Sequence, residues 1–326
     1  MPFFSLLPSL FLACGTTPAL VESWGADHQA ALAGTTLDQP LRVRVYGQAV
    51  RSSTNVSTYG DTGSIDTGVD VPTPMADAEV TFRVTSGGGS LSAEVVKTDA
   101  DGYATAMWTI GEEGEQKAVA EVFLPSGRPL DSSPIEYTAH IARASSFTDT
   151  RDGETYRTIT VEGQTWMADN LRWAGGLSDV NDQAPDETYG RYYTWLAARS
   201  ACPDGWHLPT TSEWEDLEVN MGLPPTERGV FHSDNRIGRA MKTTSGWDGD
   251  GNGSNTVGFN VVPAGTWLGV AAEHPIGSRA TFWTDTEFSP DPDNAEDRAI
   301  LAESDTLSNY ASSKLMSLSV RCVSDQ

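Results

Sequence analysis

The sequence predicts a mainly β protein of two modules, an antiparallel β-sandwich followed by an α+β domain. The 326 residues include 31 Gly and 18 Pro, a turn-rich composition that is typical of β proteins. Between residues 41 and 141 apolar side chains repeatedly alternate with polar ones, which is the two-residue period of half-buried strands. At about 150 residues per domain, the length suits two domains.

The first module is expected to span residues 37–142. Its expected strands include those around Leu41–Val45, Val80–Val84, Tyr103–Ile110, Val119–Leu124 and Ile135–Ile141. Turn sequences rich in Gly, Asp and Pro separate them, so six or seven short strands describe an antiparallel sandwich. Residues 51–74 are rich in Ser, Thr, Gly and Asp and predict an inserted, flexible surface loop.

Two segments of this module resemble the bacterial immunoglobulin-like repeats of invasin and intimin type. They are Ala78–Val84 with the following Gly87–Gly89, and Thr98–Ala104 with the later pair Trp108 and Thr109. The resemblance implies an immunoglobulin-like sandwich that holds another domain away from a membrane.

The second module is expected to span residues 146–326, after a boundary near Ala142–Ser146. A hairpin of Thr155–Val161 and Gln164–Ala168 should open it, followed by a helix from near Tyr193 to Ala201. Thr210 and Glu213 form a capping-box sequence, so a second helix should begin there. Trp214, Leu217 and Met221 then fall on one face of that helix.

Blocks rich in Trp, Cys, Pro and Gly occur at intervals along this module. They are Trp166–Asn170, Cys202–Pro209, Gly258–Gly265, Phe282–Thr284 and Ser319–Cys322. The series resembles the Fibrobacter succinogenes major paralogous domain, a bacterial extracellular module. The resemblance implies a C-type-lectin-like fold for the C-terminal half.

The three cysteines indicate an exported protein. Cys14 follows a short apolar run in residues 1–13 and resembles the lipidated cysteine of a bacterial lipoprotein signal, with residues 14–36 as a tether. Phe11 stands where Leu is usual, and no Lys or Arg precedes the run, so an ordinary signal peptide is the alternative. Cys202 and Cys322 remain as an even pair, which favours a disulfide over two free buried thiols in an oxidising compartment.

The net charge of −24 excludes a nucleic-acid-binding protein, which needs a basic surface. It also argues against docking on anionic lipid, so membrane contact is expected only through a lipid anchor. A monomer is expected.

Asp248, Asp250 and Asn252, followed by Gly253, match the opening half of a calcium loop. The match fails at the twelfth position, where Phe259 replaces the required Glu. The loop therefore predicts either a calcium site, completed by a carboxylate such as Asp285 or Glu287, or a polar turn without cofactor.

No catalytic residue stands out. The five histidines have no ligand spacing, and His207 in its block is expected to make a structural hydrogen bond. Leu208–Glu215 resembles a segment of the formylglycine-generating enzymes, but the cysteine pair that binds copper in that family is missing. A non-enzymatic protein is therefore predicted.

The sequence thus predicts a lipoprotein of the bacterial outer membrane or cell surface that displays a recognition or adhesion domain for a glycan or protein ligand. The irregular stretch Thr243–Glu303, with exposed aromatic residues, is the expected binding surface. A purely structural envelope protein is the alternative from another class, and an enzyme is the third.

Overall fold

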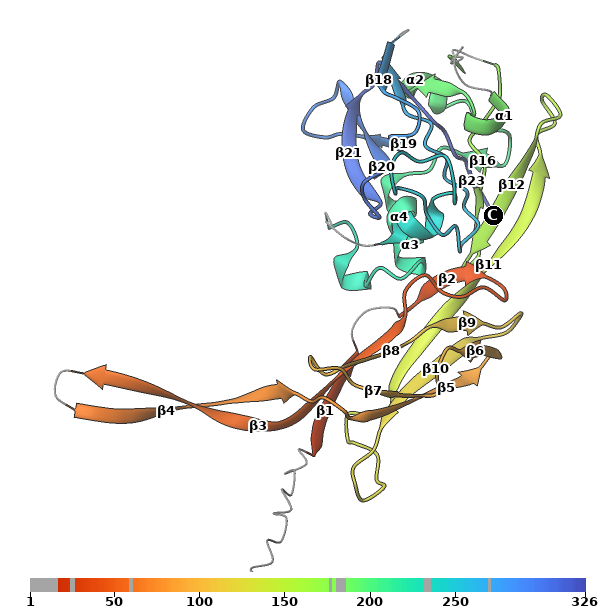
Figure 1. Cartoon of the computed structure of the whole chain (residues 1–326). Helices are drawn as coiled ribbons and strands as arrows, with labels where there is room; N and C mark the ends of the chain where they lie inside the picture. The colour runs from red at the N-terminus through yellow and green to blue at the C-terminus, as the bar shows by residue number, and fades with distance from the viewer. Residues whose placement is uncertain are drawn as a thin grey trace, which may run out of the picture.

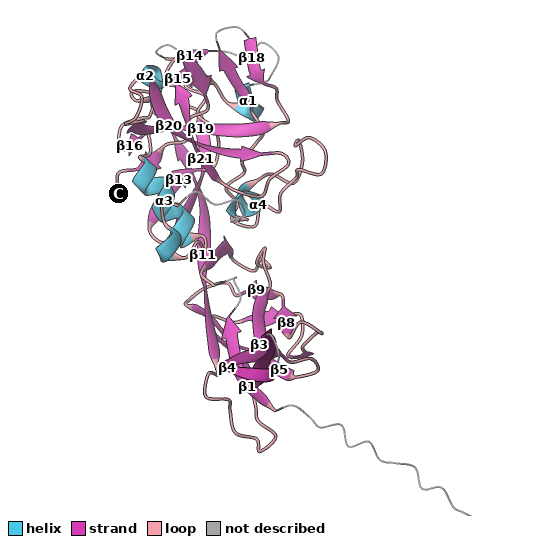
Figure 2. Ribbon diagram, turned by 90° about the vertical axis from the view of Figure 1, so that its left-hand side faces the viewer, coloured by secondary structure: helices cyan, strands magenta, loops and turns pink. Residues whose placement is uncertain are grey.

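The computed structural model describes residues 17–23, 27–58, 61–175, 178–179, 186–230, 236–268 and 271–326. Strands predominate among them, and the helices lie in the C-terminal module (Figure 2). The two modules stack end to end (Figure 1). Strand β1 (Pro18–Ser23) lies at one end of the molecule, and α2 (Trp195–Ala198) and β18 (Ala271–His274) lie at the other. The predicted architecture, a mainly β chain with an α+β C-terminal domain, is confirmed.

The N-terminal module is an antiparallel sandwich. One sheet contains β1, β3 (Leu41–Thr58), β4 (Asp61–Pro74) and β8 (Tyr103–Ala106). The other contains β2 (Gln29–Leu32), β5 (Glu79–Ser86), β7 (Val95–Lys97), β10 (Gln116–Val122) and β11 (Ile135–Thr148). A small ribbon of β6 (Gly89–Leu91) and β9 (Trp108–Ile110) completes it.

The sandwich core follows the alternation that predicted it. Val43, Phe82 and Tyr137 of the two sheets and Trp108 of the small ribbon are buried in one cluster. Burying apolar surface at about 25 cal/mol per Å² is the main favourable term in such a module. The Tyr137 hydroxyl donates to the carbonyl oxygen of Arg42 at 2.7 Å, so this buried polar group is satisfied.

Two predictions for this module are wrong. The expected tether contains two strands, because β1 pairs with β3 and β2 pairs in parallel with β11. The expected flexible loop is the outer part of the long β3–β4 hairpin, which projects from the sandwich (Figure 1). Backbone hydrogen bonds between β3 and β4 hold this hairpin together, although its sequence lacks the apolar alternation that would have predicted strands.

The predicted boundary near Ala142–Ser146 falls inside a strand. β11 pairs with β10 and β2 in the sandwich, and from Arg143 to Thr148 it pairs with β12 of the C-terminal module. One nine-stranded sheet therefore runs through both modules, and β11 is the strand they share.

The C-terminal module extends this sheet and adds two more. β12 (Thr155–Val161), β13 (Gln164–Met167), β16 (Trp206–His207) and β23 (Val323–Ser324) continue the long sheet. A second sheet contains β14 (Ser178–Asp179), β15 (Tyr192–Thr194), β17 (Thr266–Leu268), β18 and β22 (Met316–Leu318). The third contains β19 (Arg279–Glu287), β20 (Asn294–Leu301) and β21 (Ser308–Ser313).

The helices of this module are short. They are α1 (Asp186–Tyr189), α2, α3 (Thr211–Asn220), the 3₁₀ turn η1 (Pro225–Glu227) and α4 (Ile237–Met241). The helix expected at Tyr193–Ala201 is reduced to α2, because Tyr192–Thr194 is recruited into the second sheet as β15. The helix expected after Thr210 is α3, and its capping box is formed as predicted. Within the described part of the chain, no helix is long and apolar enough to cross a membrane.

Candidate functional site

Arg321 joins three of the sequence blocks of the C-terminal module. Its side chain is fully buried, and it donates to Asn170 Oδ1 and to the Asn260 carbonyl oxygen, each at 2.9 Å, and to the Phe259 carbonyl oxygen. The guanidinium also lies 4.9 Å from the ring centroid of Phe259. Burial lowers the pKa of Arg321 to about 9, opposed by the charge of Asp169, so the group stays cationic at neutral pH.

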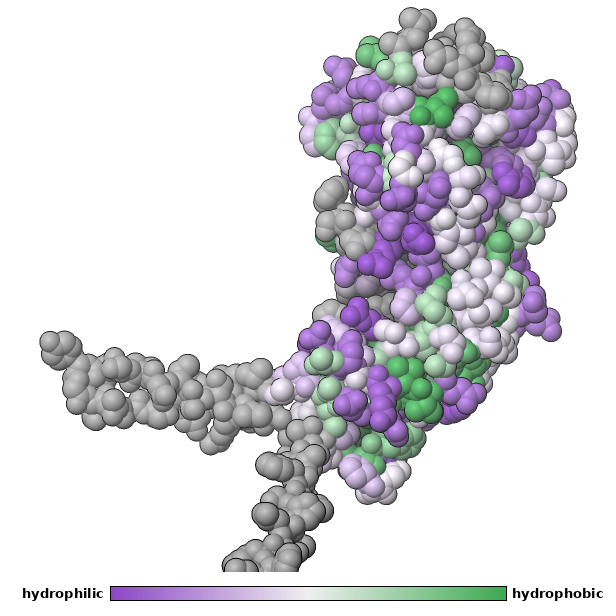
Figure 3. Space-filling view, in the orientation of Figure 1, coloured by the Kyte–Doolittle hydropathy of each residue, from purple (hydrophilic) through white to green (hydrophobic). Residues whose placement is uncertain are grey.

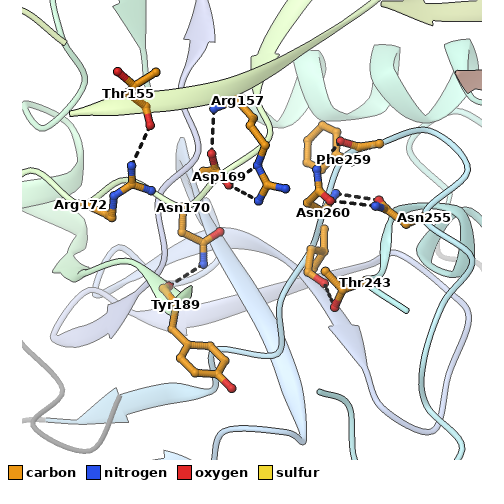
Figure 4. Close-up of polar contacts among 12 residues, drawn as sticks. Thr155, Arg157, Asp169, Asn170, Arg172, Tyr189, Thr243, Asn255, Phe259 and Asn260 are labelled. Carbon is orange, nitrogen blue, oxygen red and sulfur yellow. Dashed lines mark hydrogen bonds and ion pairs between the residues drawn. The ribbon is translucent and has the colours of Figure 1, made fainter. Parts of the chain in front are cut away.

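A surface ion pair lies beside this buried cation. Arg157 binds the Asp169 carboxylate through both Nε and Nη2, and Figure 4 shows the two side chains facing each other. Burial alone would raise the pKa of Asp169, but its hydrogen bonds with Arg157 outweigh that effect and lower it. The Arg157 side chain is 61% exposed, so the pair caps the network on the solvent side.

The turn that presents its carbonyl groups to Arg321 is held by two asparagines. Asn255 donates to Asn260 Oδ1 at 2.8 Å, and the Asn260 amide nitrogen donates back to Asn255 Oδ1 at 2.9 Å (Figure 4). Both have left-handed backbone angles, with φ of 50° and 54°, which Asn tolerates better than most residues. The block Gly258–Gly265 is thus a preorganised scaffold turn.

Cys202 and Cys322 form a disulfide, as the even pair predicted. Cys322 directly follows Arg321 and is fully buried in the second core of the module. The bond therefore ties the Cys202–Pro209 block to the same centre. Cys14 lies outside the described residues, so its lipidation stays a prediction.

His207 makes the structural contacts expected of it. Its Nε2 lies 2.7 Å from Glu213 Oε1, and its Nδ1 lies 2.5 Å from Asp325 Oδ1. Burial would lower the pKa of His207, but the hydrogen bonds with Asp325 and Glu213 outweigh it and raise the pKa. Both ring nitrogens are engaged, so this histidine holds the C-terminal segment against α3.

The three residues of the half calcium loop are placed differently from one another. Asn252 Oδ1 accepts from the Trp247 amide at 3.2 Å, which closes the turn. Asp248 and Asp250 line a depression of about 540 Å³ together with Glu303, Asp305 and Arg239. Among the described residues, no three His, Cys, Asp or Glu side chains are grouped to hold a metal. Calcium binding at this loop stays a prediction from the sequence.

The expectation of exposed aromatic residues in Thr243–Glu303 is wrong. Five of the six described tryptophans and phenylalanines of this stretch are buried, and Phe288 is half-buried; the five are Trp247, Phe259, Trp267, Phe282 and Trp283. The rings of Trp247, Phe259 and Phe282 belong to the core beside the long sheet, α3 and the third sheet, where Trp214 stacks on Phe282 with ring centroids 5.7 Å apart. Trp283 and Trp267 pack into two separate cores. The aromatic rings of the stretch therefore serve mainly the core, and β19 and β20 run through it.

Of the five exposed large apolar side chains in the described part of the module, three leucines lie at the end remote from the sandwich, and the other two are Val230 and Tyr310. Leu196, Leu268 and Leu315 are 71%, 52% and 75% exposed. Leu268 pairs with Met316 across the second sheet, and the Trp195 amide donates to the Lys314 carbonyl oxygen, so the three leucines come from neighbouring backbone. We call Leu196, Leu268 and Leu315 the distal leucines. Single leucines carry no sequence pattern, so sequence reasoning missed them.

Asp297 is a second buried charge in this module. Neither carboxylate oxygen has a hydrogen-bond partner of ordinary geometry, although its neighbour Arg298 binds Glu218 at 3.1 Å. Burial raises the pKa of Asp297 to about 6, and Ser312, Arg279 and Arg298 offset only part of that shift. The carboxyl is therefore easier to ionise in the unfolded chain.

We expect Asp297→Asn to change how stability depends on pH. A raised folded-state pKa means that the folded protein binds the proton more tightly, so the native protein loses stability as the pH rises from about 4 to about 6. The variant should lack this loss, which amounts to at most about 3 kcal/mol. Urea unfolding between pH 4 and pH 8 measures it. Asp131→Asn, at an exposed site of the sandwich, controls for removing a carboxylate, and parallel profiles for wild type and Asp297→Asn would contradict the prediction.

The known proteins that resemble this chain indicate its family but not its function. No match is found among curated proteins. A solved structure, the adhesin InvE of Yersinia pseudotuberculosis, is similar at 11% identity and a TM-score of 0.25, over 94% of this chain and 70% of the adhesin chain. So low a TM-score does not establish a shared fold. The model of the Fibrobacter succinogenes major domain matches residues 159–324, which hold every block that Arg321 and the disulfide bring together. These residues are just over half of the chain, which therefore belongs to the Fibrobacter succinogenes major domain family.

Proposed function

We propose that the chain is a non-enzymatic recognition protein of the bacterial surface, in which the sandwich holds the C-terminal module outward to bind a ligand. The observation that carries this proposal is the position of the distal leucines. Leu196 belongs to α2, Leu268 pairs with Ala271 of β18, and Leu315 directly precedes β22. α2 and β18 lie at the end of the molecule opposite β1, where a ligand on another surface would be met first (Figure 1). Apolar atoms also reach the surface on the side of the sandwich (Figure 3), so an experiment must compare the two regions.

The surroundings of the distal leucines favour a protein ligand over a glycan. The neighbouring rings of Trp195 and Trp267 are buried, so neither offers an exposed face on which a sugar could stack. Polar groups flank the leucines: Lys314 Nζ lies 4.4 Å from the ring centroid of Trp195, and Arg199 pairs with Asp285. An apolar centre within a polar rim is the usual anatomy of a protein interface.

The decisive experiment is a binding assay with the purified chain on immobilised envelope and host-surface proteins, with a glycan array in parallel. Replacing the three distal leucines by glutamate should reduce binding at least about tenfold, because buried apolar anchors dominate such interfaces. Val95→Glu with Phe123→Glu, at exposed apolar sites of the sandwich, is the matched control. Equal binding by wild type and the leucine variant would remove the proposed contact face.

The lipid anchor at Cys14 is part of the same proposal. Its support is the sequence alone, since Cys14 follows the apolar run of residues 1–13. Cys14→Ser should release the protein from the membrane fraction and abolish palmitate labelling. A wild-type protein that is already free of the membrane would contradict the anchor without touching the recognition proposal.

The alternative functions give different outcomes. A purely structural envelope protein would bind nothing in either array. Against an activity of the formylglycine-generating type, Cys202 and Cys322 are joined in a disulfide and offer no thiol pair for copper.

A further inference from the structure

Two histidines that are 112 positions apart in the sequence meet at the junction of the two modules. His28 lies between β1 and β2, and His140 lies on the shared strand β11. Their ring centroids are 5.8 Å apart, and the ring planes are inclined by 30°. Both rings line a cavity of about 610 Å³ between the sandwich and the end of α3, and both also line a neighbouring cavity of about 460 Å³. Solvent therefore reaches the space beside this pair.

The same ring nitrogen of each histidine lies beside a carboxylate, at hydrogen-bond geometry for His140 and at ion-pair distance for His28. His28 Nδ1 lies 3.1 Å from Asp27 Oδ2, and His140 Nδ1 lies 2.7 Å from Glu162 Oε1. A carboxylate at Nδ1 keeps the proton on that nitrogen and leaves the lone pair of a neutral ring on Nε2. This is the arrangement by which carboxylates orient and strengthen histidines that bind metals.

The Nε2 atoms of this pair have no partner among the described residues, which distinguishes them from His207 with both nitrogens engaged. The backbone of His28 adds a second unusual feature. Its φ is 58°, a left-handed conformation that costs free energy in a residue other than Gly or Asn. The Asp27 side chain fixes this conformation, because its Oδ1 accepts from the amides of both His28 and Thr138. Strained backbone of this kind tends to cluster at functional sites.

We propose that His28 and His140 bind a divalent transition-metal ion through their Nε2 atoms, with water completing the coordination. Imidazole ligands suit Zn²⁺, Cu²⁺ and Ni²⁺, whereas Ca²⁺ and Mg²⁺ prefer oxygen. Both ligands come from the sandwich, whereas Glu162 belongs to the β12–β13 turn of the C-terminal module, so its contact with His140 would connect the ion site to that module. With only two protein ligands, the ion would also keep open positions for an external ligand.

Titration of the full chain, without a polyhistidine tag, with zinc chloride in a calorimeter tests this site. We expect one zinc ion per chain. His28→Asn, which keeps a residue that tolerates the left-handed backbone, and His140→Gln should each weaken binding by at least about tenfold, and Glu162→Gln by about 10- to 100-fold. His207→Gln is the matched control and should leave zinc binding unchanged, because both nitrogens of His207 are already engaged.

A second measurement identifies the ligand atoms directly. In the nitrogen NMR spectrum of the wild-type histidine side chains, zinc should shift the Nε2 signals of two rings. These zinc-dependent shifts should be lost in His28→Asn and His140→Gln. Undetectable zinc binding by the wild type, or binding that survives both substitutions, would overturn the proposal. Neither outcome bears on recognition by the distal leucines, which lie at the other end of the C-terminal module.

Discussion

Replacing Arg321 by methionine is expected to lower the free energy of unfolding by about 3 to 5 kcal/mol. The substitution leaves Asn170 Oδ1 and the carbonyl groups of Phe259 and Asn260 buried without their donor. Removing one partner of a buried charged network costs this much, because each orphaned acceptor keeps its desolvation penalty. Urea denaturation followed by tryptophan fluorescence measures the loss.

Arg157→Met is the matched control for Arg321→Met. It removes the same charge from the same neighbourhood, but its side chain is largely exposed and pairs with Asp169 at the surface. Exposed ion pairs contribute about 0 to 1 kcal/mol, so this variant should unfold close to the wild type. If the two variants lost equal stability, the buried hydrogen bonds of Arg321 would not be what joins the blocks. Should Arg321→Met fail to accumulate folded, Arg321→Lys keeps the charge and tests the hydrogen-bond geometry alone.

Removal of the disulfide is the second change with a large expected effect. The bond joins residues 120 positions apart. In the chain-entropy account, a crosslink of this length restricts the unfolded chain enough to stabilise the folded protein by about 4 to 5 kcal/mol. Cys202→Ser combined with Cys322→Ser should therefore show a much lower denaturation midpoint.

Reduction of the wild type provides the comparison for the double-serine variant. Dithiothreitol should bring the wild type down to the stability of the variant and should leave the variant itself unchanged. A wild type that is equally stable with and without reductant would show that the fold, and not the crosslink, supplies the stability of this region.

The scaffold of the C-terminal module could be predicted because it contains residue types with few alternative structural roles. The side chains of Thr210 and Glu213 predict the start of α3, and the capping box is formed as the sequence indicates. The even pair of cysteines predicts the disulfide in the same way. Each signal is local or carried by a residue type with few alternative roles.

The junction of the modules could not be predicted, because its order is held by the backbone. Arg143 to Ser146 have exposed side chains, so no apolar alternation marks them, and yet they pair with Arg157 to Thr160 of β12. The outer part of β3 and β4 was misread as a loop for a similar reason. A ladder of backbone hydrogen bonds leaves little trace in side-chain chemistry.

The candidate sites depend on contacts over long sequence distances. Spacing rules compare neighbours along the chain, so they could not bring His28 to His140 or Leu196 to Leu268 and Leu315. The aromatic residues of Thr243–Glu303 illustrate the opposite error. Their number predicts a binding face, but in the folded module these large rings fill the space between the sheets.

Since β11 is one uninterrupted strand, the chain has no hinge at the boundary expected between the modules. Force applied between the distal end and β1 would act along this strand and would load its hydrogen bonds in shear, so that they resist together and do not open one after another. Melting the sandwich would also strip β12 of its neighbour and expose an open sheet edge. The two modules are therefore expected to unfold in a single cooperative transition, and a fragment cut at Ser146 would lose part of the strand that completes its own sheet.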